Sequence, residues 1–477
     1  MAGKFKKLMG NTLIFAIGSF ASKAMVLLLM PLYTRVLTDA EFGAADLVST
    51  TANLLTPFVM LSINEAIIRF AMDRSYKKEE VFTVGIETTL LGILVFGLFS
   101  PLMLKIKLIS PYVLLIFLYV AAAAIKLICA QFVRSCGMTR LFALDGFLAT
   151  LTTILFNILY LVVFKWGSTG FVLSIISSNV LSVLFLTITA RLWRYIKISG
   201  LNRDLMGQMI RYSVPIIPTT MFWWITTASD RFVVTYFCGE GVNGIYSASH
   251  KLPGLLTIVS AVFYQAWQIS AIDESGKGEK TEEFYNEVYE YYIALLFLAC
   301  SGLIMICRPV ISVWLSESFY DSWMFVPFLA VAEVFSTLVT FLGSFYMVSK
   351  QNKTIVLAIG AGAVCNMILN LVLVPKYGAF GAAFATVVSY ILAFCVRGWD
   401  IKRFVNIDLR AMQIIVCVCV LAYQTYSLFN CGWKYPLLKQ VLIFLGMCLV
   451  NSTSIIKLVK SFLSVVLPKI LKRRKAQ

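Results

Sequence analysis

The sequence predicts an all-α polytopic membrane protein with about 14 transmembrane helices. The 477 residues are 60% hydrophobic and only 14% charged, and the mean hydropathy is +0.85. A soluble domain has roughly 45–50% apolar and 25% charged residues. The apolar residues form runs of about 20, the length that one transmembrane helix needs. Since no long polar block separates these runs, a soluble enzyme with a membrane tail is excluded.

The helices are expected wherever an apolar run lies between short polar links. The links are about 5–20 residues long, which leaves no room for a globular domain outside the membrane. The predicted spans are 9–33, 43–67, 81–104, 109–132, 143–164, 169–190, 212–237, 242–270, 288–315, 323–348, 354–375, 379–397, 410–429 and 436–456.

The basic residues indicate the orientation of these spans. The chain has 41 Lys and Arg against 24 Asp and Glu, a net charge of +17. With the spans above, 29 of the 41 lie on the side of the termini, eight lie on the opposite side and four lie well inside spans. Cytoplasmic loops carry such an excess of Lys and Arg. We therefore expect both termini in the cytoplasm, and the charge predicts no nucleic-acid binding, because no basic block lies on a soluble domain.

Cysteine and histidine give no sign of a metal or redox site. Most of the 11 cysteines lie within apolar runs, no CxxC occurs, and His250 is the only histidine. Zinc sites need clustered Cys and His ligands. The cysteines are expected to pack as small hydrophobic residues, and no cofactor is expected. The apolar run after Lys7 continues to Leu32 without a convincing cleavage site, which disfavours a secretory signal peptide.

The chain contains a weak internal repeat of about 200 residues. Gly43-Ala-Ala-Asp46 and Gly244-Ile-Tyr-Ser247 each follow a polar turn, and each glycine precedes a Leu-Leu pair by 11 residues. Gly-x-x-Gly starts two further helices, at Gly167 and at Gly378. Parallel repeats in transporters form two bundles that move around a central site. We expect a six-helix lobe over 1–200, a second over 201–405, and two additional helices with a basic cytoplasmic tail over 406–477.

Three segments together resemble a known family of transporters. They are Pro31–Gly43 (PLYTRVLTDAEFG), Gly244–Lys251 (GIYSASHK) and Asn370–Ala383 (NLVLVPKYGAFGAA), and Asp230 also matches the pattern. The whole chain resembles the polysaccharide transporters, or O-antigen flippases, of the superfamily that includes the multidrug and toxin extrusion (MATE) transporters. The resemblance implies a MATE-like fold with a central cavity. It also implies transport of undecaprenyl-diphosphate-linked oligosaccharide from the cytoplasmic to the outer leaflet of the bacterial inner membrane.

Ionisable residues inside the predicted spans are the candidate site. Such a residue costs at least roughly 2.5–3.5 kcal/mol at the bilayer centre, so it normally faces a cavity or a partner. Lys and Arg suit a diphosphate because they make charge-assisted hydrogen bonds to it. The predicted substrate ligands are Lys23, Arg35, Arg231 and Lys251.

Acidic and polar residues form a second candidate set. Asp46, Thr50 and Asn53 share one face of a helix, and Ser247 and Lys251 share a face of the equivalent helix in the second repeat. We expect these faces to meet across the central cavity. The candidates for cavity polarity or for coupling to H+ or Na+ are Asp46, Thr50, Asn53, Asp230 and Glu333.

Other functions remain open from the sequence. One is export by another member of the superfamily, either a multidrug extruder or a lipid II flippase. Another is an integral-membrane polysaccharide polymerase or acyltransferase, although the single histidine and the short outer loops disfavour an enzyme. The expected partners are lipid-linked oligosaccharide, membrane lipids, and the polymerase and glycosyltransferases of a surface polysaccharide. The glycan itself has no linear code in the chain.

Overall fold

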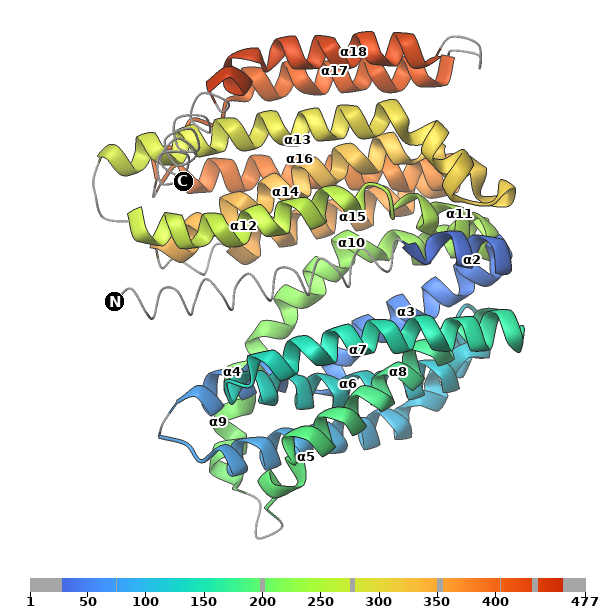
Figure 1. Ribbon diagram of the computed structural model, residues 1–477, viewed down its shortest axis with the longest axis vertical. Helices are drawn as coiled ribbons and strands as arrows, with labels where there is room; N and C mark the ends of the chain where they lie inside the picture. The colour runs from blue at the N-terminus through green and yellow to red at the C-terminus, as the bar shows by residue number, and fades with distance from the viewer. Residues whose placement is uncertain are drawn as a thin grey trace, which may run out of the picture. The chain divides into compact units, whose positions relative to one another are not determined.

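The structure, a computed structural model, describes residues 28–73, 75–197, 202–274, 279–349, 355–403, 405–430 and 436–457. These residues are almost entirely helical, and none of them forms a β-strand (Figure 1). They divide into two compact units. Unit 1 holds the described residues up to Ala248 together with Trp314–Tyr320 and Asn370–Ala379, and unit 2 holds the rest.

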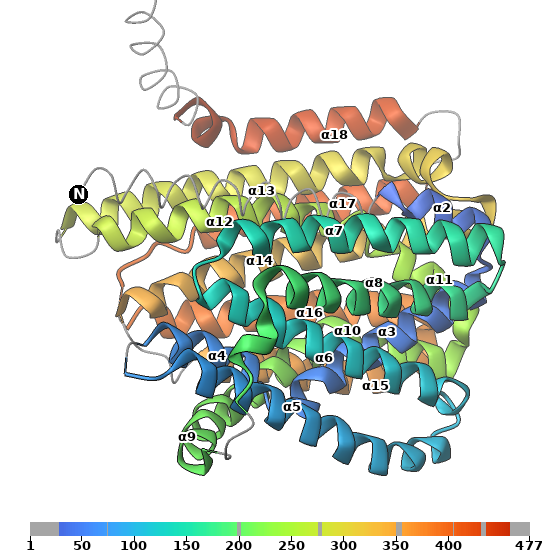
Figure 2. The same cartoon turned by 60° about the horizontal axis from the view of Figure 1, so that its bottom comes forward.

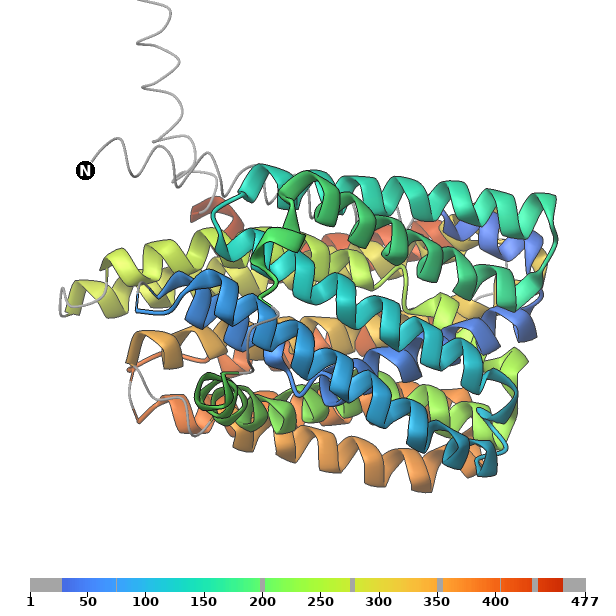
Figure 3. The same ribbon diagram turned by 90° about the horizontal axis from the view of Figure 1, so that it is seen from below.

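Unit 1 is a bundle of long helices. Helices α7 and α8 pack side by side, and α6 packs against α8 and α3 (Figure 2). Figure 3 shows α5 to α8, coloured blue to green, running roughly parallel to one another. The helices are α2 (Met30–Val36), α3 (Asp39–Val59), α4 (Ile63–Met72), α5 (Lys78–Phe99), α6 (Val113–Ser135), α7 (Thr139–Asn157), α8 (Gly167–Ala190), α9 (Arg203–Ser213), α10 (Ile217–Cys238) and α11 (Glu240–Ser249).

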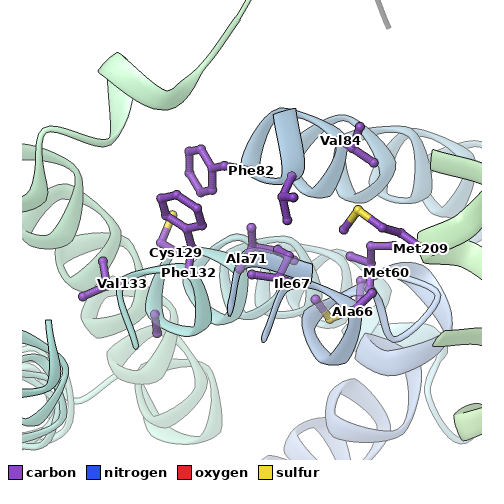
Figure 4. Packing of buried hydrophobic residues seen from close by; sticks show 14 of the residues in the cluster. Met60, Ala66, Ile67, Ala71, Phe82, Val84, Cys129, Phe132, Val133 and Met209 are labelled. Atoms are coloured by element: carbon purple, nitrogen blue, oxygen red, sulfur yellow. The ribbon is translucent and has the colours of Figure 1, made fainter. Parts of the chain in front are cut away.

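A hydrophobic cluster joins α4, α5, α6 and α9 within unit 1 (Figure 4). The rings of Phe82 and Phe132 lie 4.4 Å apart, and both side chains are buried. Gly85 on α5 allows Ile67 of α4 to approach closely, because a methyl group at Gly85 would lie 2.6 Å from Ile67 Cδ1. This packing fixes α4 against the bundle although α4 is only 10 residues long.

The second predicted span, 43–67, is interrupted in the structure. It forms α3 and α4, which meet at an angle of 51°. Leu61 and Ser62 have φ of 49° and 50°, values that few residues other than glycine adopt. Pro57 lies one turn before this break and has no N–H to donate along the helix. The prediction of one continuous helix was therefore wrong at residues 60–62.

Unit 2 contains the remaining long helices and the two C-terminal helices. Helix α12 packs against α14, and α17 packs against α18. The helices that lie wholly or mostly in unit 2 are α12 (Gly254–Glu274), α13 (Glu279–Trp314), α14 (Val326–Ser349), α15 (Ile355–Tyr377), α16 (Ala379–Ile401), α17 (Ala411–Asn430) and α18 (Pro436–Val450). The end of α15, residues 370–377, belongs to unit 1.

The helices confirm the predicted all-α membrane fold. In the described residues, nine helices are long and apolar enough to cross a membrane, and ten if α3 and α4 count as one bent span. Most of the predicted span 9–33 lies outside the described residues. Span 242–270 is divided into α11 and α12 at 250–253, where Pro253 has no N–H to donate. Span 143–164 ends in a π-helical segment, Ile158–Val163, instead of a regular α-helix.

Candidate substrate site

Helix α3 begins at a well-defined cap. The Thr38 hydroxyl accepts a hydrogen bond from the Glu41 N–H at 3.2 Å, and the Thr38 N–H donates to Glu41 Oε2 at 2.9 Å. This reciprocal capping box satisfies two N–H groups that a helix start otherwise leaves unpaired. The cap fixes the first turn of α3 and therefore the position of Gly43, one turn later.

Gly43 on α3 and Gly244 on α11 bring the backbones of these two helices into contact. A methyl group at Gly43 would lie 2.0 Å from the carbonyl oxygen of Glu240, and one at Gly244 would lie 1.9 Å from the carbonyl oxygen of Asp39. The contact is reciprocal, because residue 43 corresponds to 244 and residue 39 to 240 in the sequence repeat. The Asn243 side chain adds a hydrogen bond from Nδ2 to the Gly43 carbonyl at 3.1 Å.

One turn further along, Asp46 is the centre of a buried polar network. The Ser247 hydroxyl of α11 donates to Asp46 Oδ2 at 2.8 Å. Arg231 Nη1 of α10 lies 3.2 Å from the same oxygen and donates to Thr50 Oγ1, also at 3.2 Å. The side chains of Arg231 and Asp46 are only 16% and 10% exposed. Two charges so well shielded from solvent attract each other more strongly than at the surface, but the cost of removing both from water offsets much of this attraction.

Asp230 extends this network on α10. Its Oδ2 accepts a hydrogen bond from the Tyr246 hydroxyl at 2.6 Å, and both side chains are buried. Its Oδ1 accepts the backbone N–H of Arg231 at 2.9 Å. Trp224, two turns earlier on α10, donates its indole N–H to the Thr50 carbonyl at 3.2 Å. We call Asp46, Thr50, Asp230, Arg231 and Ser247 the Asp46 network.

Arg231 retains a free donor in this network. Within the described residues, its buried Nε–H has no hydrogen-bond partner. An unsatisfied buried donor costs about 1–3 kcal/mol, and more for a charged group, so such groups normally bind water or a ligand. Arg231 therefore keeps one buried hydrogen-bond donor that the Asp46 pair does not use.

The structure brings together four of the nine residues that the sequence predicts for the site: Asp46, Thr50, Asp230 and Arg231. Arg35 is exposed in the last turn of α2, and Asn53 is exposed on α3. Lys23 lies outside the described residues. Lys251 and Glu333 belong to unit 2.

Glu333 has its own contact in unit 2. Its Oε2 accepts the Thr257 hydroxyl at 2.7 Å, which joins α14 to α12. Lys251 is partly buried in the turn between α11 and α12. The functional roles of Lys251 and Glu333 stay predictions.

The structure brings the faces that carry Asp46 and Ser247 into direct contact through the hydrogen bond between these two side chains. The physical reason is the pair of glycines one turn earlier, which lets the backbones touch. Tyr246 and Asn243 were missed as members of the site. The similarity of Gly244–Ser247 to Gly43–Asp46 in the sequence indicated that this turn of α11 is part of the site. It did not indicate that the Tyr246 and Asn243 side chains belong to it.

Comparison with known proteins gives the family. Residues 8–268, more than half of the chain, match the family model described as polysaccharide biosynthesis protein. The chain belongs to this family. Two uncharacterized membrane proteins of Methanocaldococcus jannaschii are 25% and 22% identical over 206 and 257 residues, which is 43% and 52% of this chain. The chain spans about half the length of these relatives, 47% and 49%.

Solved structures show the same fold. A lipid II flippase, MurJ, in an inward closed conformation matches with a TM-score of 0.72 and 16% identity, over 94% of this chain and 99% of that chain. An inward-facing multidrug resistance MATE family transporter of the MOP superfamily matches with a TM-score of 0.60 and 14% identity, over 80% and 98%. At these identities the likeness shows the fold alone. This family member is therefore a multi-pass membrane protein with a MATE-like fold. The likeness does not identify its substrate.

Proposed function

We propose that the chain is a flippase that moves a polyprenyl-diphosphate-linked oligosaccharide, with undecaprenyl as the expected lipid, from the cytoplasmic to the outer leaflet of the bacterial inner membrane. The observation that supports this most is the Arg231–Asp46 pair, a buried cation in contact with a carboxylate and with the Thr50 hydroxyl, while the Ser247 hydroxyl donates to the same carboxylate. A diphosphate oxygen has the same charge and hydrogen-bonding capacity as the Asp46 carboxylate. Asp46 therefore occupies the place on Arg231 that a phosphate group of the substrate would take.

The proposed mechanism is an exchange of anions on Arg231. When substrate enters, a diphosphate oxygen replaces Asp46 on the Arg231 guanidinium, and the unpaired Nε–H offers it a further donor. Asp46, Asp230 and Glu333 are proposed as the carboxylates that couple transport to H+ or Na+. Lys23, Arg35 and Lys251 are proposed as further contacts to the diphosphate.

The contact between α3 and α11 has a role in the proposed transport cycle. Alternating access requires that the two lobes, proposed over 1–200 and 201–405, separate on one side at a time. Helices α3 and α11 come from corresponding positions of these lobes, and the Asp46–Ser247 hydrogen bond and the two glycines hold them together. Release of Asp46 from Arg231 would weaken the same contact. Substrate binding and opening are thereby linked through one side chain.

A multidrug extruder is the second candidate, and a specific observation favours it. The Asp46 network contains two carboxylates, Asp46 and Asp230, against one cation, Arg231. A surplus of acid suits a cationic drug better than a diphosphate. The two candidates differ in how replacement of Arg231 should affect transport. Arg231 binds substrate in a flippase, whereas it only balances charge in an extruder.

The deciding experiment is deletion of the gene followed by analysis of lipid-linked oligosaccharide in each leaflet. The proposal requires accumulation on the cytoplasmic side, restored to normal by the wild-type chain and not by Arg231→Gln. Arg69→Gln, which removes an exposed pair with Asp73, is the matched control and should restore transport. If no accumulation follows deletion while export of cationic drugs is lost, the extruder replaces the flippase.

A further inference from the structure

We propose that a crevice between α16 and α17 binds one acyl chain of an anionic phospholipid of the cytoplasmic leaflet, with the lipid phosphate at Lys402. The crevice lies within unit 2 and is separate from the Asp46 network. It has a volume of about 460 Å³. This proposal does not depend on the transported substrate.

The walls of the crevice are apolar. Ile391, Phe394 and Cys395 of α16 line one wall, Ile414 and Val418 of α17 line the other, and Phe335 of α14 contributes as well. Cavities lined only by such side chains do not hold water, since water needs two to four polar partners. A hydrocarbon chain meets no such requirement, and each CH₂ group that it buries contributes roughly 0.8 kcal/mol. The walls therefore fit a lipid tail.

The connection between the two helices forms one end of the crevice. Leu409 packs against Gly398, where a methyl group would lie 2.8 Å from Leu409 Cδ1. Leu409 and Lys402 both belong to the lining of the crevice. Trp399, at the same end, is 66% exposed. Exposed Trp and Lys side chains at a helix end are typical of the membrane–water interface.

The charges at this end favour an anionic headgroup. In the part of the chain that the structure describes, Lys402 forms no ion pair. Arg403 Cζ lies 4.4 Å from the centre of the Trp399 ring, and Arg403 Nη1 lies 3.6 Å from Asp400 Oδ1. The charge of Arg403 is therefore partly offset. The group of Lys402, Arg403 and Asp400 carries a net charge of +1. The connection also belongs to the basic side of the membrane in the sequence analysis. A basic pocket between transmembrane helices on that side suits an anionic lipid headgroup.

The test measures lipid binding to the full-length protein in detergent by native mass spectrometry. Phosphatidylglycerol and phosphatidylcholine with the same acyl chains are the probes, added separately. We expect phosphatidylglycerol to bind, and Lys402→Gln to weaken its binding about fivefold, since a basic residue at the membrane surface contributes about 1 kcal/mol. Lys78→Gln, at the start of α5, is the matched control and should bind as the wild type does.

A second variant tests the crevice itself. Ile415→Trp places a large ring at the exposed Ile415 on the crevice wall and should abolish binding of both lipids. Equal binding of the two lipids to the wild type would overturn the anionic headgroup, and so would equal effects of Lys402→Gln and Lys78→Gln. Unchanged binding to Ile415→Trp would overturn the crevice. Undecaprenyl phosphate is added as a third probe, and its binding in place of phosphatidylglycerol would overturn the phospholipid as the occupant of the crevice. If Ile415→Trp fails to fold, the effect of Lys402→Gln on phosphatidylglycerol binding still tests the proposal.

Discussion

Gly43 and Gly244 occupy equivalent positions on α3 and α11, and each lies against a backbone carbonyl of the other helix. A methyl group at either position would come within 2.0 Å of a carbonyl oxygen. The same two helices share the Asp46–Ser247 hydrogen bond one turn later. A weak similarity in the sequence thus corresponds to a direct contact in space, and that contact positions the Asp46 network.

Gly43→Ala and Gly244→Ala should each separate α3 from α11. Added atoms in a tightly packed contact typically cost about 1–3 kcal/mol, and here the neighbour is backbone, which cannot rotate away. Thermal unfolding of the purified protein measures the cost, and transport should fall in parallel. Gly146→Ala on α7 is the control, since a methyl group there meets nothing within 4 Å. Loss of stability in the control alone would contradict the prediction.

Asp46 and Arg231 should show strong energetic coupling. Removal of one partner of a buried pair costs roughly 3–5 kcal/mol, because the other charge stays buried and unpaired. We expect Asp46→Ala and Arg231→Ala each to lower the unfolding temperature. The stability lost in the double variant should be smaller, by about 0.5–3 kcal/mol, than the sum of the losses in the two single variants. Additive effects would mean that the pair does not form.

The two glycines that start the second pair of similar helices should respond differently to substitution. Gly167 and Gly378 have φ of 55° and 58°, so Ala costs roughly 1–2 kcal/mol at either position. At Gly167 the methyl group would also lie 2.4 Å from Glu41 Oε1, which belongs to the α3 capping box. At Gly378 its nearest neighbour is Cys238 Sγ at 3.6 Å. Gly167→Ala should therefore unfold at a lower temperature than Gly378→Ala, and equal values would argue against the Glu41 contact.

Glu290 should hold the C-terminal helices to α13. This buried carboxylate accepts Arg410 Nη2 at 2.9 Å, the Ser454 hydroxyl at 2.9 Å and Lys457 Nζ at 3.4 Å. Glu290→Gln should cost more than about 1 kcal/mol and expose α17 and α18 to protease, because Lys457 then lacks a counter-charge and Arg410 keeps only Asp408. Asp408→Asn, which removes the more exposed partner of Arg410, should cost at most about 1 kcal/mol. Limited proteolysis with mass spectrometry distinguishes the two variants.

Much of the fold could be predicted from the sequence because the bilayer imposes simple rules. Apolar runs of about 20 residues form helices, and the distribution of Lys and Arg indicates on which side of the membrane each loop lies. Helix α10 is an informative exception. It is 22 residues long, yet it is not among the helices apolar enough to cross a membrane by composition. It carries Trp224, Asp230 and Arg231, which the structure places in the polar network. The residues that weaken its membrane signal are those of the candidate site.

The sequence by itself determined the helical membrane fold, the repeated segments and the identity of the rare charges within spans. Only the tertiary structure decided which charges meet. Arg231 pairs with Asp46 across 185 residues, and Asp230 binds Tyr246 instead. Hydropathy acts locally along one helix, whereas such pairs depend on how closely two helices approach. That distance was set by Gly43 and Gly244, whose missing side chains let α3 and α11 touch.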